Sequence, residues 1–186
     1  MNKIPTIEAS EANEQIAPLY EAVQKKLGLL PNMVKALGNN AAALNAYLGI
    51  SGALGEGRLP AKTREKIALF VAEQNGCHYC LSAHTAIGGL LKIPASEIES
   101  ARRGEAEDVK EQAILELTRQ ILATRGAVTD EVYEAARAAG VTTEEVTELV
   151  AHVAVNVFTN YFNSLAGTEV DFPPAKPLTE GLATAG

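Results

Sequence analysis

The sequence has few of the residues that typify secreted or membrane-spanning proteins. It contains only two cysteines and no tryptophan, and aromatic side chains make up 5% of its 186 residues. No run is long and apolar enough for a transmembrane helix, which needs about 20 such residues. Residues 1–15 also lack the basic and then apolar order of a signal peptide. We therefore expect a cytoplasmic protein with no membrane partner.

The charge and composition of the chain restrict its possible ligands and its fold class. The formal net charge of −7 disfavours binding to nucleic acids or to anionic lipids. Hydrophobic residues account for 47% of the chain, and alanine and leucine supply most of them, which favours helices over sheets. No alternating strand pattern is present. We expect an all-α protein with one helical domain over residues 1–174 and an irregular tail over residues 175–186.

Glycine, proline and capping residues divide the chain into separate helices. Ser10 is expected to cap the first helix and Gly28 to end it. The predicted helices span residues 10–27, 33–37, 40–54, 62–75, 77–91, 96–103, 109–124, 130–139 and 144–165.

The most informative motif joins both cysteines to a histidine. Cys77, Cys80 and His84 are spaced i, i+3 and i+7, which places all three on one face of a helix. Both cysteines fall in the first turn, where free N–H groups and the helix dipole stabilise an anion. The spacing therefore predicts a reactive thiolate, because the thiolate is the nucleophilic form of cysteine.

Two thiols at this spacing suit peroxide reduction or disulfide exchange. One thiolate attacks, and the other resolves the product to a Cys77–Cys80 disulfide. His84 can move protons near neutral pH. Glu65 lies 12 residues before Cys77, and it comes within reach of His84 if Asn75-Gly76 folds the chain back. Glu73 is a weaker alternative to Glu65.

Other interpretations of these residues remain open. A CxxC pair can form half of a zinc site, and Cys77, Cys80 and His84 would complete it with Glu65 or His152. Glu65 could also be a surface charge that pairs with a neighbouring cation.

The last predicted helix carries a polar stripe on an apolar background. His152, Asn156, Asn160 and Asn163 recur at helical spacing. A buried hydrogen-bond ladder or a subunit interface explains such a stripe most simply. The sharper interpretation is that His152 or Asn156 faces the cysteine pocket.

The cysteine motif and its flanks resemble the alkylhydroperoxidase AhpD-like, carboxymuconolactone decarboxylase superfamily, and in particular its peroxidase-related branch. The resemblance lies in the run Glu65…Asn75-Gly76-Cys77-His78-Tyr79-Cys80…Ala83-His84. Three further segments also match the pattern of this superfamily: Leu30-Pro31-Asn32, 43–54 and Asp171-Phe172-Pro173. The resemblance therefore extends over residues 15–174.

The resemblance implies an all-helical fold that forms a trimer or a hexamer. It implies an antioxidant peroxidase that reduces hydroperoxides without metal or haem, its redox group being the Cys77–Cys80 disulfide. Cys80 would be the peroxidatic cysteine and Cys77 the resolving one, with Glu65 and His84 as a proton relay. The reductant would be a lipoylated or a thioredoxin-like protein.

One position departs from the family pattern. The family relay has a histidine immediately before the second cysteine, whereas this sequence has Tyr79 there and His78 one place earlier. With an ordinary pKa of about 10, tyrosine moves protons poorly at neutral pH. We therefore expect either slower peroxidase turnover or a different substrate. Tyr79, His78, His152 and Asn156 are expected as supporting residues. The decarboxylase branch, which would use His84 and Glu65 as acid and base, is the alternative.

Overall fold

The computed structural model describes residues 2–178, and these residues form helices and no strands. This confirms the predicted all-α class. A short 3-10 helix (Ala9–Glu11) precedes the α-helices. These are α1 (Ala17–Leu27), α2 (Asn32–Leu37), α3 (Ala41–Gly55), α4 (Ala61–Gln74), α5 (His78–Leu90), α6 (Ala95–Arg103), α7 (Val109–Thr124), α8 (Asp130–Ala138) and α9 (Thr143–Ala166).

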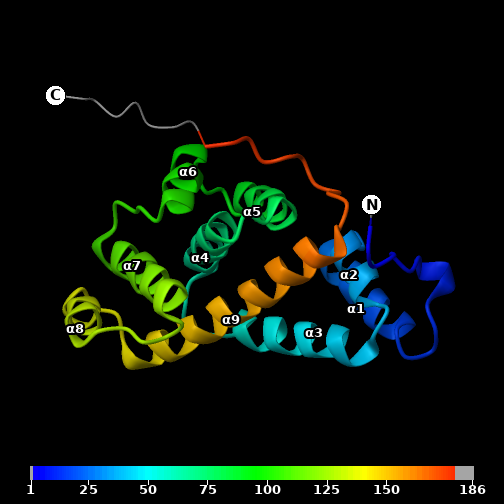
Figure 1. The fold of residues 1–186 in the computed structure, drawn as a ribbon, viewed down its shortest axis with the longest axis horizontal. Coiled ribbons are helices and arrows are strands. Elements are labelled where there is room, and N and C mark those ends of the chain that lie inside the picture. Colours follow the sequence, from blue (N-terminus) through cyan, green and yellow to red (C-terminus); the bar gives the residue numbers. More distant parts are fainter. Residues whose placement is uncertain (1, 179–186) are drawn as a thin grey trace.

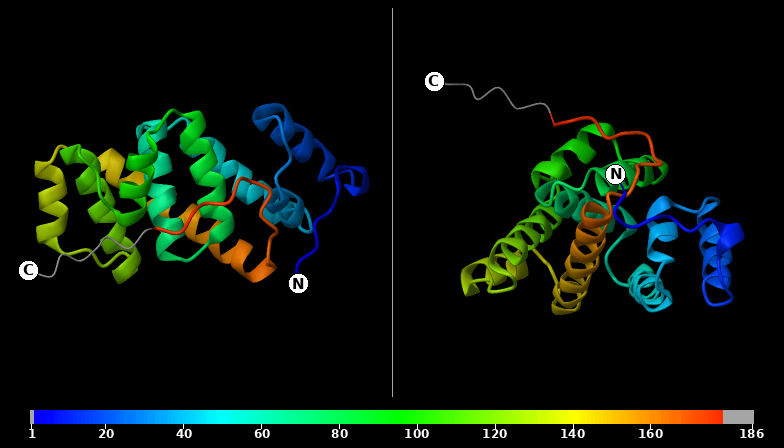
Figure 2. Two further views of the ribbon diagram at one scale, coloured as in Figure 1. Left: turned by 90° about the horizontal axis from the view of Figure 1, so that it is seen from above. Right: turned by 45° about the vertical axis from the view of Figure 1, so that its right-hand side comes forward.

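Helix α4 forms the centre of the molecule. It packs against α5, α6, α7 and α9 (Figure 1). Its segment from Ile67 to Ala72 is buried without interruption, because neighbours cover it on every side. The longest helix, α9, runs past α3, α4, α5 and α7. Helices α1 and α2 lie at one end of the molecule, and α7 and α8 at the other (Figure 2).

A tight turn joins α4 to α5 and positions the cysteines. Asn75 ends α4, and Gly76 follows with a φ of +62°, a conformation that glycine adopts without steric cost. Cys77 then caps α5, with its sulfur accepting a hydrogen bond from the N–H of Cys80 at 3.3 Å. The turn reverses the chain as the sequence predicts, so the two helices that carry Glu65 and His84 lie side by side.

The prediction for the start of the first helix was wrong. Ser10 lies within the 3-10 helix, and α1 begins at Ala17. The side chain of Asn13 accepts hydrogen bonds from the N–H groups of Gln15 and Ile16, which stabilises a turn between the two segments.

The segment that follows α9 lies along α5 and α6 (Figure 1). The N–H of Ala175 donates to the Ser82 hydroxyl at 3.1 Å, and Arg102 donates to the Lys176 carbonyl at 2.8 Å. Residues 175–178 have no regular secondary structure, and residues 179–186 of the predicted tail lie outside the described residues.

None of the helices in residues 2–178 combines the length and the apolar character that crossing a membrane requires.

Candidate active site

The two cysteines lie together at the start of α5. Both are reduced and buried, and the Cys77 thiol donates to the sulfur of Cys80 with 2.6 Å between the sulfurs. Cys77 is the helix cap and Cys80 is the third residue of the helix. Cys80 therefore lies where free N–H groups and the helix dipole favour negative charge.

The surroundings of Cys80 favour its thiolate. The Cys77 hydrogen bond is the main cause that lowers the pKa of Cys80 to about 6, against the opposing effect of burial. The charge of His84 and the amides of Asn163 and Asn160 lower it further. The pKa of Cys77 is raised by the same hydrogen bond and by burial. The Cys80 sulfur is therefore the more readily ionised of the two.

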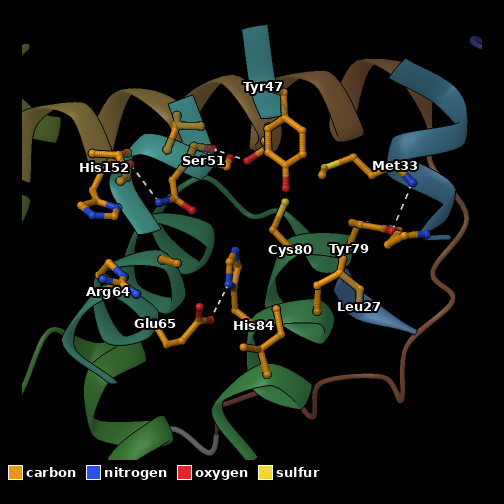
Figure 3. A pocket seen from close by; sticks show the side chains of 18 of the residues that line it. Leu27, Met33, Tyr47, Ser51, Arg64, Glu65, Tyr79, Cys80, His84 and His152 are labelled. Atoms are coloured by element: carbon orange, nitrogen blue, oxygen red, sulfur yellow. Dashed lines mark hydrogen bonds and ion pairs between the residues drawn. The ribbon is translucent and has the colours of Figure 1, made fainter. Parts of the chain in front are cut away.

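His84 and Glu65 form the ion pair that their spacing suggested. Nδ1 of His84 lies 2.7 Å from Oε2 of Glu65. Burial opposes charge on the imidazole, but the Glu65 carboxylate and the Cys80 sulfur together raise the pKa of His84. Figure 3 shows the ring of His84 between the Glu65 carboxylate and the Cys80 sulfur, with its other nitrogen free to face the reacting group. Glu73 has a different partner, since it accepts from Arg102 at 2.7 Å.

A mostly apolar cavity of about 310 Å³ opens onto Cys80. Its walls come from α1 to α5, from α9 and from the segment after α9. Cys80, His84 and Glu65 line this cavity, whereas Cys77 is not among its lining residues. A substrate in the cavity therefore meets the sulfur of Cys80 and not that of Cys77.

Tyr79 is held as part of the cavity wall. Its hydroxyl accepts from the N–H of Met33 at 3.2 Å, and its ring packs edge-on against Phe172 at 5.8 Å. Burial is the main cause that raises the pKa of Tyr79 above its ordinary value. The hydroxyl thus stays protonated at neutral pH and links α5 to α2. His78 is exposed, and the structure does not bring it into the cavity.

The polar stripe of α9 faces the site along much of its length. His152 and Asn156 line the cavity, and Asn156 donates to the His152 carbonyl at 2.8 Å. Asn163 donates to the sulfur of Cys80 at 3.3 Å, and Asn160 accepts from Asn75 at 2.9 Å. The stripe is buried, and its last asparagine, Asn163, reaches the sulfur of Cys80 directly.

Two residues that line the cavity were not predicted from the sequence. Figure 3 shows the hydroxyl of Tyr47, from α3, pointing toward the sulfur of Cys80. Burial is the main cause that raises the pKa of Tyr47, so it remains a hydrogen-bond donor. Arg64, next to Glu65, also lines the cavity. The only signal for Tyr47 was its i, i+4 spacing to Ser51 on an Ala/Leu-rich helix.

The position of His152 is relevant to the possible zinc site, for which His152 was a candidate ligand. His152 lies 3.3 Å from the carboxylate of Glu148, away from the cysteines. In residues 2–178, no group of three or more His, Cys, Asp or Glu side chains is arranged to hold a metal ion.

These features define a helical protein with a buried CxxC pair at the N-terminus of a helix, where Cys80 opens onto an apolar cavity. Residues 40–119 match the sequence model of the Carboxymuconolactone decarboxylase family. A search of curated proteins gave no match. The matched stretch is therefore similar to that family, and AhpD-like proteins of known structure share the fold of the chain.

Solved structures with the same fold cover nearly the whole chain. A peroxidase-related protein from Ralstonia eutropha, described as an alkylhydroperoxidase AhpD core, is 24% identical with a TM-score of 0.81, covering 91% of this chain and 92% of its own. A peroxidase-related protein from Silicibacter sp. is 24% identical with a TM-score of 0.79, covering 90% and 89%. The debrominase Bmp8, in a cysteine-to-alanine variant bound to 2,3,4-tribromopyrrole, is 19% identical with a TM-score of 0.78, covering 92% of each chain.

Proposed function

We propose that the protein is a thiol-dependent peroxidase that reduces organic hydroperoxides with Cys80 and Cys77. The observation that carries the proposal is the asymmetry of the pair. Cys80 opens onto the cavity and its pKa is lowered to about 6, whereas Cys77 lies behind it with a raised pKa. One thiolate and one thiol at 2.6 Å are the starting state of a dithiol peroxidase cycle.

In the first step the Cys80 thiolate attacks the terminal oxygen of the hydroperoxide. The O–O bond breaks, Cys80 becomes a sulfenic acid, and the alcohol leaves as an alkoxide. His84, whose pKa is raised, donates the proton that converts the alkoxide to the alcohol. Glu65 holds the imidazole in place and stabilises its charged form.

In the second step the sulfur of Cys77 attacks the sulfenic acid. Its thiol proton leaves with the hydroxyl as water, and the Cys77–Cys80 disulfide forms. An external dithiol then reduces this disulfide and is itself oxidised to a disulfide, which restores both thiols. We propose a lipoylated or thioredoxin-like protein as this dithiol.

Tyr79 does not block this scheme, because the relay needs no proton from that position. The hydroxyl of Tyr79 is engaged with Met33, and His84 is the imidazole beside Cys80. The family histidine missing at this position would supply a second proton carrier, so slower turnover remains our expectation.

The two steps can be tested separately with single cysteine variants. Organic hydroperoxide consumption is measured with a dithiol reductant, and sulfenic acid is trapped with dimedone. We expect Cys80→Ser to abolish both signals. Cys77→Ser serves as the matched control, since it should still form one sulfenic acid per chain while losing dithiol-driven turnover. Equal hydroperoxide consumption by wild type and Cys80→Ser would refute the proposal.

The likeness to a debrominase provides a second substrate for the same assay. A dithiol can replace an aryl bromine by hydrogen, releasing bromide and a proton as the pair is oxidised to a disulfide. The apolar cavity at Cys80 is compatible with a ring substrate. Bromide release from 2,3,4-tribromopyrrole in the absence of hydroperoxide consumption would favour this reaction over peroxide reduction.

A further inference from the structure

The cavity at Cys80 has two unlike ends. Figure 3 shows Met33 and Tyr79 on one side of Cys80, and Arg64 and His152 on the other. A bound molecule that spans the cavity would thus meet apolar and aromatic side chains at one end and a guanidinium group at the other. Its reacting group would lie between the two ends.

Arg64 has no anionic partner among residues 2–178. Its Nη1 donates to the carbonyl of Leu59 at 2.8 Å, and it forms no ion pair with a described side chain. The nearby carboxylates are engaged elsewhere. Glu65 lies 2.7 Å from His84, and Glu148 accepts from the N–H of Arg58 at 2.6 Å and lies 3.3 Å from His152. The remaining donors of the guanidinium are therefore left for a ligand.

An unpaired, half-buried guanidinium in an apolar cavity is costly unless an anion joins it. Arginine presents planar pairs of N–H donors that match the two oxygens of a carboxylate. The neighbouring His152 does not compete for an anion, because burial lowers its pKa more than the hydrogen bond and the charge of Glu148 raise it. The negative charge of Glu65 is balanced by His84.

We propose that Arg64 binds a carboxylate of the substrate, so that the preferred substrate is a hydroperoxy acid. Its carboxylate lies at Arg64, its apolar end lies toward Met33 and Tyr79, and its hydroperoxide is internal, at Cys80. At about 30 Å³ for each water-sized group, the cavity of about 310 Å³ holds a molecule of medium chain length. The internal hydroperoxide rests on the proposed function, whereas the carboxylate subsite can be tested without any reaction.

The subsite is tested first by calorimetric binding of octanoate and of octanamide, its neutral analogue. We expect wild type to bind octanoate about ten-fold more tightly, as a charge-assisted hydrogen bond predicts. Arg64→Met should remove this preference while keeping the methylene stem, and Arg64→Lys should retain part of it. Arg58→Met is the matched control, because Arg58 is exposed, pairs with Glu144 and does not line the cavity.

A kinetic comparison then tests the substrate class. A medium-chain hydroperoxy acid and its methyl ester are compared as substrates of wild type and of Arg64→Met. We expect wild type to have a KM about ten-fold lower for the acid, and the variant to have similar KM values for both. Thermal unfolding of Arg64→Lys and Arg64→Met checks that both variants are folded.

The outcomes separate this inference from the proposed function. Octanoate and octanamide binding equally well to wild type would overturn the carboxylate subsite even if hydroperoxides are consumed. A preference for octanoate that survives in folded Arg64→Met would overturn the role of Arg64. Arg64-dependent octanoate binding without hydroperoxide consumption would support the subsite and refute the peroxidase.

Discussion

The side-chain amide of Asn163 donates a hydrogen bond to the sulfur of Cys80 at 3.3 Å, although the two residues are 83 positions apart in the sequence. Asn163 lies near the end of α9, and Cys80 lies in the first turn of α5. The hydrogen bond strengthens when the sulfur is ionised, because an anion is the better acceptor. Helix α9 therefore contributes to thiolate stability as well as to packing.

The contribution of this amide can be measured in the variant Asn163→Ala. A hydrogen bond to a charged group contributes about 1.5–3 kcal/mol, so its loss should move the Cys80 titration upward by at least about one pH unit. The titration is followed by the rate of alkylation with iodoacetamide as a function of pH, in a Cys77→Ser background with a single thiol.

Asn156→Ala is the matched control for this measurement. It removes the same side chain from the same helix, but Asn156 donates to the carbonyl of His152 and not to sulfur. We expect the alkylation midpoint of the control to stay near that of its parent. Equal midpoints in Asn163→Ala and its parent would show that the amide does not stabilise the thiolate.

The sequence predicted the fold class and most helix boundaries, because capping residues and glycines mark them locally. It also predicted the pairing of His84 with Glu65, since a tight turn at Asn75-Gly76 brings two neighbouring helices together. Local signals could not show that Asn163 reaches Cys80 or that Tyr47 points at it. Those contacts depend on how α9 and α3 pack, which spacing within one helix does not determine.

The proton relay predicts a bell-shaped pH dependence for the reaction of Cys80 with hydroperoxide. The rate should rise as pH increases through about 6, where Cys80 becomes a thiolate. It should fall at higher pH, as His84 loses the proton that the leaving alkoxide needs. The pKa of His84 is raised above its ordinary value, so the alkaline limb should lie above about 6.5.

Glu65→Gln should move this alkaline limb to lower pH. The glutamine keeps the shape of the side chain but removes the charge that supports the imidazolium, so burial then lowers the pKa of His84. Stopped-flow rates of sulfenic acid formation between pH 5 and about 9 would locate both limbs. A variant with a lower rate but an unmoved alkaline limb would mean that Glu65 acts otherwise than through His84.

Tyr79→Phe should reduce stability more than catalysis. The change leaves the buried N–H of Met33 without its acceptor, which costs about 1–3 kcal/mol, while His84 and the cysteines remain in place. Chemical denaturation measures the stability, and the dithiol-coupled assay measures the rate. Tyr161→Phe, at a side chain 62% exposed, is the control for loss of a hydroxyl. A rate that collapses in folded Tyr79→Phe would assign this hydroxyl to the relay instead.

The outer face of α9 leads to a prediction about assembly. Val150, Phe158, Tyr161 and Leu165 recur at helical spacing, and their exposed fractions run from 40% to 62%. Contiguous apolar surface of this kind marks interaction sites. We propose that a second copy of the chain covers it, as expected for a homo-oligomer, trimer or hexamer.

The double variant Tyr161→Glu/Leu165→Glu should weaken this assembly, because association would bury two unpaired carboxylates. Light scattering after size-exclusion chromatography gives the mass of each variant, and we expect a shift from oligomer to monomer. Leu90→Glu is the control, since Leu90 is 82% exposed and belongs to α5, not to the outer face of α9. If the double variant keeps the wild-type mass, or if wild type is already a monomer, the α9 face is not the interface. If the double variant is a monomer, its Cys80 alkylation midpoint compared with that of the wild-type oligomer shows whether the thiolate depends on assembly, because Asn163 lies on this same helix.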